Sequence, residues 1–380
     1  MDDIRASTHA NEQWLRATLG AEVVEADLAA RRAKLADTPF TYLRAAYWRW
    51  VELLPESWTP KRPGAAVLAV GDIHLENFGT WRDGEGRLVW GVNDFDEAAV
   101  MPWPLDLLRL ATSAHMAHDD PEAGDAAIDA AASAIMGGYG KGLERPRPII
   151  LDHDFAWLRQ TVLVARSAED QAAQEKARKT FWKKMASPKE PPATAPPARL
   201  LNALRAALPL GATEAGLWPR RAGAGSLGRP RWVMRAEWQG GPILREAKAM
   251  LPSAWVRLHG DGPIACRAAE AATGAYRAPD PCQSFLDGIA VRRLSPNNQK
   301  FEAGKHPEIL FDPRMLKAMG RDLAAVHAAT MGAARAITGE IAAGAPLDAE
   351  GKRLAKAARQ LAQRLRQDQA EVPRSWRGEA

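Results

Sequence analysis

The chain has 380 residues, of which 46% are hydrophobic and 26% charged. This balance is typical of a globular protein and excludes a disordered or collagen-like chain, while the length predicts two or three domains or one large two-lobed unit. The net charge of +5, from 51 Lys and Arg against 46 Asp and Glu, is too small over this length to indicate a dedicated nucleic-acid binder.

Apolar stretches fall far short of the roughly 20 residues that cross a bilayer, and the first residues are polar and acidic, unlike those of a signal peptide. Cys266 and Cys282 form no CxxC pair, so they predict neither a zinc site nor a disulfide scaffold. We therefore expect a cytoplasmic protein that has no membrane partner. The oligomeric state is left open by the sequence.

The first elements are predicted to be helical. Residues 11–36 carry apolar side chains at spacings of three and four, and the run Asp37-Thr38-Pro39 predicts a capped second helix that ends at Pro55. A short apolar strand over 65–70 follows. The turn signal at 82–86 then separates two strand-like runs, and residues from 105 to about 137 are again typical of a helix.

Residues 168–200 differ in composition from the rest. A basic helix is predicted first, then a proline-rich linker over 188–199. The basic run, with Phe181 and Trp182, is a weak candidate for nucleic-acid binding, although a solvated helix face is the more usual explanation. The run comprises Lys176, Arg178, Lys179, Lys183, Lys184 and Lys189.

The segment after the linker is glycine-rich and then strand-like on both sides of a Gly-Gly turn. A helix over 265–277, a further strand over 284–296 and helices from Pro313 onward complete the prediction. We divide the chain into a helical lobe (1–200), a small β-rich nucleotide-binding lobe (201–300) and C-terminal helices that complete the helical lobe (301–380).

Two acidic segments carry the chemistry. Asp72 and Asn77 lie five positions apart after the predicted strand, and Asp94, Asp96 and Glu97 follow one hairpin later. Phosphoryl transfer needs such a set, because one carboxylate orients the attacking hydroxyl while amide and carboxylate oxygens hold magnesium. The alternatives are an Asp-initiated turn capped by Asn, and solvated turn acids at the second segment.

The segments GDIHLENFG, NDFDEA and PLDLLRL resemble the aminoglycoside-phosphotransferase branch of the kinase-like fold. They resemble more closely the uncharacterised bacterial domain-of-unknown-function 2252 family. The resemblance implies that Asp72 is the catalytic base, that Asn77 and Asp94 bind magnesium, and that Asp106 is structural. Asp96 is a further candidate metal ligand. His74 is either a catalytic residue or a loop histidine that hydrogen bonds locally.

A kinase also needs a glycine-rich loop over the phosphates and a lysine on a neighbouring strand. Both are found after the linker, where a plain hairpin loop is the alternative for the glycines. Candidate nucleotide-binding residues in that loop are Gly223, Gly225, Ser226 and Gly228.

The strand over 243–249 offers Arg245 and Lys248, which face opposite sides of a regular strand, so only one can reach the phosphates. The family pattern places a lysine five residues before a serine, which favours Lys248 with Ser253. Ala249 departs from that pattern and keeps Arg245 as an alternative. Glu270 is a candidate partner of the lysine, or else an exposed helix residue.

The run Leu323–Ala328, LAAVHA, is similar to the helix that directly precedes the catalytic loop in aminoglycoside kinases, yet here it lies near the C-terminus. The resemblance therefore implies an α+β, two-lobed, kinase-like fold that is circularly permuted. Its larger lobe is helical and its small lobe contains an antiparallel sheet. New termini are tolerated in exposed connections, which makes permutation physically reasonable.

We expect an ATP- and magnesium-dependent phosphotransferase that acts on the hydroxyl of an unidentified small-molecule or protein acceptor. One alternative is AMP transfer on the same fold, and another is a nucleotide-binding regulator without turnover. A metal-dependent phosphatase or nuclease would leave the glycine loop and Lys248 unexplained.

Overall fold

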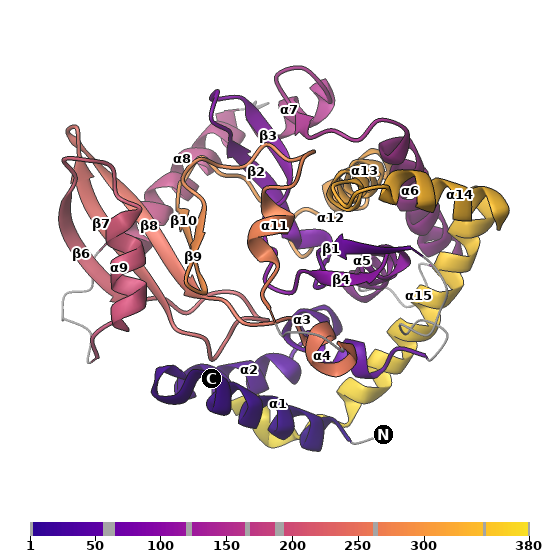
Figure 1. The fold of residues 1–380 in the computed structure, drawn as a ribbon, viewed down its shortest axis with the longest axis horizontal. Helices are drawn as coiled ribbons and strands as arrows, with labels where there is room; N and C mark the ends of the chain where they lie inside the picture. Colours follow the sequence, from indigo (N-terminus) through magenta and orange to yellow (C-terminus); the bar gives the residue numbers. More distant parts are fainter. Residues whose placement is uncertain are drawn as a thin grey trace.

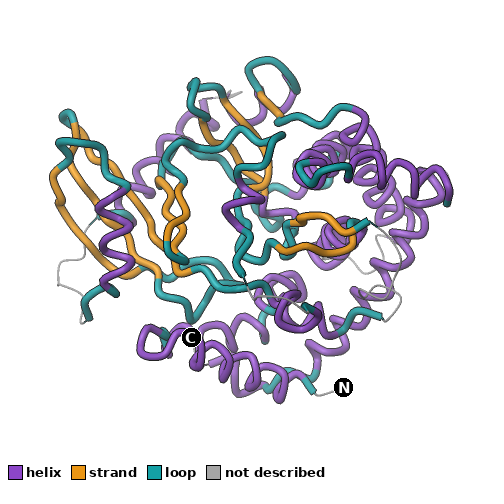
Figure 2. Tube along the Cα trace, in the orientation of Figure 1, coloured by secondary structure: helices purple, strands orange, loops and turns teal. Residues whose placement is uncertain are grey.

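The computed structural model describes residues 3–55, 65–118, 124–163, 168–186, 194–260, 265–344 and 347–378. Residues 188–193 of the predicted linker, including Lys189, lie outside the described residues. The chain is an α+β protein in which the five-stranded sheet lies at one end of the molecule and most of the helices lie toward the other (Figures 1 and 2). None of the helices within the described residues combines the length and apolar character needed to cross a membrane.

Helices form most of the regular structure within the described residues. They are α1 (Ile4–Leu19), α2 (Glu25–Leu35), α3 (Pro39–Ala45), α4 (Tyr47–Glu52), α5 (Pro104–Ala117), α6 (Gly124–Glu144), α7 (Ala156–Leu163), α8 (Ala168–Lys184), α9 (Ala198–Ala206), α10 (Ala254–His259), α11 (Ala268–Ala272), α12 (Pro307–Leu310), α13 (Pro313–Ala328), α14 (Ala333–Ala343) and α15 (Leu347–Ala370), with 3₁₀ turns η1 (Gly20–Glu22), η3 (Leu75–Asn77) and η4 (Arg374–Gly378).

Within the described residues the strands form three antiparallel sheets, with orders β1-β4, β2-β3-β5 and β6-β7-β8-β10-β9. They are β1 (Ala66–Ala69), β2 (Phe78–Arg82), β3 (Leu88–Val92), β4 (Ala99–Pro102), β5 (Ile149–Ile150), β6 (Thr213–Pro219), β7 (Arg231–Trp238), β8 (Gly241–Ala249), β9 (Ser284–Leu286) and β10 (Ile289–Arg293). The predicted strand over 65–70 and the predicted hairpin turn at 82–86 are therefore confirmed by β1 and by the β2–β3 pair.

The five-stranded sheet has two different faces because side chains alternate along its strands. One face packs against α9, where Leu200 and Leu204 contact Ala247 and Ala249 of β8 in an apolar cluster. The other face carries Glu246 and Lys248, which belong to the same strand. The apolar end of α8 covers part of this second face through Phe181. The sheet thus directs charged side chains toward the centre of the molecule.

The helices near the C-terminus pack on helices from the first half of the chain (Figure 1). At the α6–α13 contact the two backbones approach closely, because Gly138 and Gly320 have no side chains. A Cβ atom on Gly320 would lie 2.0 Å from the carbonyl oxygen of Ile135, and one on Gly138 would lie 2.0 Å from that of Lys317. Glycine is therefore required at both positions.

Four predicted helices differ from the structure. The stretch predicted as helical from 105 to about 137 forms two helices, because α5 ends at Ala117, where His118 has an extended backbone, and α6 begins at Gly124. The helix predicted over 11–36 is interrupted at Gly20, whose φ of +55° ends α1 and turns the chain into α2. The capped helix after Thr38 begins as predicted, with Thr38 accepting from Thr41 N–H, but breaks at Ala46. The helix predicted over 265–277 is formed only as α11.

Candidate functional site

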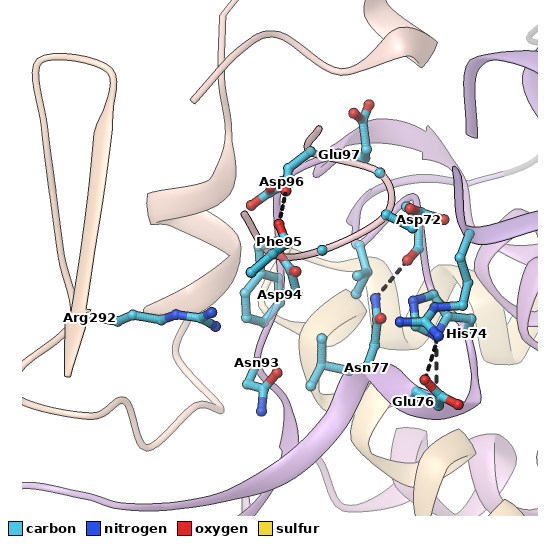
Figure 3. A pocket seen from close by; sticks show the side chains of 18 of the residues that line it. Asp72, His74, Glu76, Asn77, Asn93, Asp94, Phe95, Asp96, Glu97 and Arg292 are labelled. Carbon is cyan, nitrogen blue, oxygen red and sulfur yellow. Dashed lines mark hydrogen bonds and ion pairs between the residues drawn. The ribbon is translucent and has the colours of Figure 1, made fainter. Parts of the chain in front are cut away.

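A cavity of about 690 Å³ lies between the five-stranded sheet, the β2–β3 hairpin and the N-terminal helices. It brings together segments that are far apart in the sequence: the loop after β1, the segment after β3 and the loop between β6 and β7. Figure 3 shows the first two of these segments facing each other. The predicted site residues that line it are Asp72, His74, Asn77, Asp94, Asp96, Gly223, Gly225 and Ser226.

The loop after β1 begins at a glycine that no other residue can replace without strain. Gly71 has φ +83°, and a Cβ atom there would lie 2.2 Å from the carbonyl oxygen of Glu97. Asp106, predicted to be structural, is fully buried and accepts hydrogen bonds from the backbone N–H groups of Val70 (2.7 Å) and Gly71 (2.9 Å). Asp106 thus fixes the chain immediately before Asp72.

Asp106 is itself held by His327, the histidine of the LAAVHA helix, α13. The two side chains are both 0% exposed, and His327 Nε2 lies 3.0 Å from Asp106 Oδ2. Tyr139 completes the buried chain, with its hydroxyl 2.8 Å from His327 Nδ1. Since a carboxylate oxygen accepts, we place the imidazole proton on Nε2, so that Nδ1 accepts from Tyr139.

Asp72 is paired with a buried arginine. Arg109 of α5 is 0% exposed, and its Nη2 donates to Asp72 Oδ1 at 2.5 Å and to the carbonyl of Leu43 at 2.6 Å. Burial raises the pKa of Asp72 to about 6, although the charge of Arg109 opposes this rise. Asp72 keeps 18% of its side chain exposed to the cavity. A carboxyl in this environment is suited to accept a proton near neutral pH.

Asn77 and His74 are fixed by contacts within the same loop. Asn77 Nδ2 donates to the backbone oxygen of Asp72 at 2.7 Å, which leaves Oδ1 as the acceptor atom (Figure 3). His74 Nδ1 accepts from the backbone N–H of Glu76 at 3.2 Å. Burial, with the charges of Arg44 and Arg109, holds the pKa of His74 well below its usual range. His74 therefore hydrogen bonds within its own loop, as expected for the alternative in which it has no catalytic role.

The second acidic segment contacts the sheet. Lys248 Nζ lies 3.4 Å from Asp94 Oδ1 and also forms an ion pair with Asp96. Burial raises the pKa of Asp94, but Lys248 and a hydrogen bond with Asp96 outweigh it and hold that pKa well below its usual range. For Asp96, burial and the charge of Asp94 raise the pKa. Asp94 is thus the more acidic carboxyl, and 40% of its side chain is exposed.

The glycine loop connects β6 to β7 and lies against Asp72. Gly223 and Gly228 have φ values of +77° and +92°, a region that favours glycine. A Cβ atom on Gly225 would lie 3.2 Å from Asp72 Oδ2. Ser226 Oγ accepts from Arg231 Nη2 at 2.7 Å. The loop therefore approaches the early carboxylate through its backbone.

Three candidates lie elsewhere. Gly228 faces Leu28 of α2, whose Cδ2 would lie 2.4 Å from a Cβ atom at this position. Arg245 faces away from the acids, as its Nε donates to the carbonyl of Ala207 at 3.0 Å. Glu270 is exposed on the short helix α11 and pairs with Arg267 Nε at 2.5 Å, whereas Lys248 pairs with the two aspartates. Glu270 thus matches the alternative, an exposed helix residue, because its carboxylate pairs with Arg267 three positions earlier on the chain.

Sequence reasoning missed several charged residues that line the cavity or support it. Arg109 lies among the leucines of PLDLLRL, and a charged residue in such an apolar helical run was the sequence signal for a buried ion pair. Lys300 follows β10 and forms an isolated β-bridge with Gly79. It is open to the cavity, yet desolvation by the surrounding walls and the charge of Arg292 lower its pKa to about 8. No sequence pattern indicated Lys300.

Across the described ranges, three or more His, Cys, Asp or Glu side chains nowhere gather as a preformed metal site. Asn77, Asp94 and Asp96 nevertheless present one amide and two carboxyl groups at the same cavity. This donor set fits Mg²⁺, which binds through one or two carboxylates together with substrate phosphates and water rather than through an all-protein cage.

The fold and site define an α+β protein with a polar cavity lined by acids from one half of the chain and glycines from the other. Residues 23–195 match the model of a family described as "Uncharacterized protein conserved in bacteria (DUF2252)". The match supports the resemblance to this uncharacterised bacterial family. It includes Asp72, Asn77 and Asp94 but ends before the glycine loop and Lys248. No curated protein matches the chain, and no solved structure matches it.

Proposed function

We propose that the protein is an ATP- and magnesium-dependent phosphotransferase with a kinase-like fold. One observation carries the proposal: Lys248 lies against Asp94, 154 positions away, beside the cavity that Asp72 and the glycine loop share. A lysine, a metal-binding aspartate and a catalytic aspartate grouped in this way are the parts that phosphoryl transfer requires.

The connectivity of the sheet supports the kinase-like part of the proposal. The glycine loop joins the first and second strands of the five-stranded sheet, β6 and β7, and Lys248 lies on the third, β8. Protein kinases place their glycine-rich loop and their lysine in the same succession. Here these parts follow the catalytic segment in the sequence, and α13 contacts Asp106 through His327. This order is what circular permutation would produce.

In this proposal Asp72 orients the acceptor hydroxyl and takes its proton, while Arg109 holds the carboxylate in place. Asn77, Asp94 and Asp96 would hold magnesium, which supplies positive charge against the phosphates. Lys248 and Lys300 contribute cations on the nucleotide side. Catalysis then consists mainly of positioning and electrostatic stabilisation.

The test is ATP binding and turnover with magnesium. We expect Asp94→Asn to remove magnesium-dependent ATP binding and Asp72→Ala to keep binding while it stops turnover, as measured by calorimetry and product analysis. Glu214→Gln, a change at an exposed residue of β6, serves as the control and should alter neither. Absence of ATP binding by the wild-type protein would refute the proposal.

Mass spectrometry of the products separates the alternatives. Release of ADP supports phosphoryl transfer, whereas release of pyrophosphate indicates AMP transfer by the same site. Tight ATP binding without turnover on any acceptor would indicate a regulator.

A further inference from the structure

Three arginines line the same cavity on the side formed by the N-terminal helices. They come from three separate elements: Arg31 from α2, Arg229 from the end of the glycine loop and Arg257 from α10. None of them takes part in the phosphotransfer chemistry described above.

Arg31 is buried without a carboxylate partner. It is 2% exposed, its Nη2 donates to the carbonyl oxygen of Gly225 at 2.5 Å, and its guanidinium lies over the ring of Trp48. Its Nε and Nη1 atoms have no hydrogen-bond partner, and the described residues provide no ion pair for it. A buried guanidinium with two unused donors is rare, because such groups normally find acceptors.

The two neighbouring arginines are only partly compensated. Arg229 is 4% exposed, pairs with Glu97 at 2.9 Å and lies 3.7 Å from Asp96 Oδ2, but its Nε and Nη1 atoms have no hydrogen-bond partner. Arg257 Nη2 donates to Asn11 Oδ1 at 3.0 Å, and its Nε has no partner. Glu97 also accepts from the backbone N–H of Ala254. Two carboxylates, Glu97 and Asp96, therefore pair with Arg229, while Arg31 and Arg257 form no ion pair within the described residues.

The pKa values of Arg31 and Arg257 agree with this lack of a paired carboxylate. Burial, together with the charge of Arg229, lowers the pKa of Arg31 to about 10. Burial also lowers the pKa of Arg257. The planar donor fork of arginine matches the oxygens of carboxylate and phosphate groups, so an anion would satisfy the unused donors.

We propose that Arg31, Arg229 and Arg257 form an anion site that binds a phosphate or carboxylate group of the substrate, apart from Lys248. Gly225 connects this site to the chemistry, since its carbonyl accepts from Arg31 while its Cα faces Asp72 Oδ2. A hydroxyl at Asp72 and an acidic group at the arginines thus lie within the span of one small molecule. Resting on the proposed function, this assigns the acceptor to the acidic hydroxyl compounds.

The site is tested first without ATP, so that its outcome does not depend on the proposed function. The unfolding midpoint is measured in phosphate and in chloride of equal ionic strength, for the wild type and for Lys248→Met, in which the proposed nucleotide-phosphate site is weakened. We expect phosphate to raise the midpoint in both. Arg31→Met and Arg257→Met should weaken phosphate binding at least tenfold, while Arg205→Met, at an exposed arginine, should not.

Arg31→Met should fold, because an apolar side chain replaces an unpaired buried charge, and its midpoint in chloride should equal or exceed that of the wild type. If it does not fold, the half-buried Arg257 provides the test. Equal protection by phosphate and chloride, or full phosphate protection in both arginine variants, would overturn the proposal.

Turnover distinguishes the source of the anion. With ATP, matched pairs such as glycerol and glycerol 3-phosphate, or glucose and glucose 6-phosphate, are compared as acceptors. If the acceptor supplies the group, the acidic member is preferred and Arg257→Met lowers its kcat/KM at least tenfold without changing ATP affinity. If a nucleotide bound in the reverse orientation supplies it, Arg257→Met weakens ATP binding tenfold and pyrophosphate is released. Acidic acceptors used no better than their neutral counterparts, and equally well by wild type and Arg257→Met with unchanged ATP affinity, would overturn the proposal.

Discussion

At the scale of single residues, the environment of Asp72 decides what its carboxyl can do. Burial disfavours its charged form, while the pair with Arg109 keeps that form accessible, and the balance raises its pKa to about 6. An unperturbed aspartate would be a much weaker base at neutral pH. The buried pair therefore combines a fixed geometry with a useful basicity.

The first prediction concerns the pH dependence of turnover. Asp72 must be deprotonated to accept a proton, and its pKa is raised to about 6, so kcat/KM should be constant above that pH and fall about tenfold per unit below it. The pH–rate profile from pH 4.5 to 8 measures this. Asp72→Asn should lose the acid limb together with most of the rate. A wild-type profile that stays level down to pH 5 would contradict the prediction.

The second prediction concerns Lys300, whose lowered pKa of about 8 means that its positive charge is present below pH 8 and lost above it. ATP affinity should therefore weaken between pH 7 and pH 9 in calorimetric titrations. Lys300→Met should bind ATP about tenfold more weakly at pH 7, the effect of one lost charge-assisted contact, and should change less with pH.

Lys305→Met, at an exposed lysine of the same loop that pairs with Glu302, is the control and should resemble the wild type. An identical pH dependence in wild type and Lys300→Met would show that another group is responsible.

At the scale of elements, β8 separates two kinds of positive charge by the alternation of its side chains. Lys248 faces the aspartates, while Arg245 is held on the opposite side by the carbonyl of Ala207. The register of β8 with β7 and β10 pairs Lys248 with Arg231 and Ala290, so a one-residue slip would exchange the two faces.

The third prediction compares these two positions. Lys248→Met should weaken ATP binding at least tenfold and lower kcat about a hundredfold, because it removes a cation from the phosphates. Arg245→Met should change ATP affinity less than twofold and destabilise the fold by about 1–2 kcal/mol, through its lost hydrogen bonds. Calorimetry and urea unfolding measure the two effects. The reverse pattern would favour Arg245 as the phosphate ligand.

At the scale of the whole molecule, the last long helix joins the N-terminal helices to the helical core. Asp368 of α15 is buried and pairs with Arg49 of α4, at 2.6 Å between Oδ1 and Nη2, and it also accepts from the hydroxyl of Tyr42. The N-terminal helices in turn support the glycine loop through Arg31. Stability and site geometry are thus linked across the chain.

The fourth prediction is that Asp368→Ala destabilises the protein by about 3 kcal/mol, because it removes the buried counter-ion of Arg49 and leaves only the partly exposed Glu52 as its partner. Urea unfolding measures this loss, and ATP affinity of the folded fraction should be unchanged. Asp129 of α6 is half-exposed and pairs with Arg359 of α15. Asp129→Asn should therefore lower the free energy of unfolding by less than about 1 kcal/mol. Equal effects of the two changes would argue against a structural role for the Asp368 cluster.

The sequence alone determined the local parts of this protein. The α+β class, the strand before Asp72, the hairpin before Asp94 and the cap at Thr38 all follow from patterns a few residues long. The spacing of Asp72, Asn77 and Asp94 also lies within one short segment, which is why the family resemblance is found there. Local rules suffice for such features, since turns, caps and alternation depend on neighbouring residues.

Only the tertiary structure decided which distant charges meet. It placed Lys248 rather than Arg245 beside the acids, left Glu270 exposed, and gathered the three arginines below the glycine loop. No local pattern encodes these contacts, because the free energy of a buried charge depends on the desolvation and the partners that the complete fold provides. The sequence thus indicates which charged and polar side chains could take part in a reaction, and tertiary packing determines which of them line the same cavity.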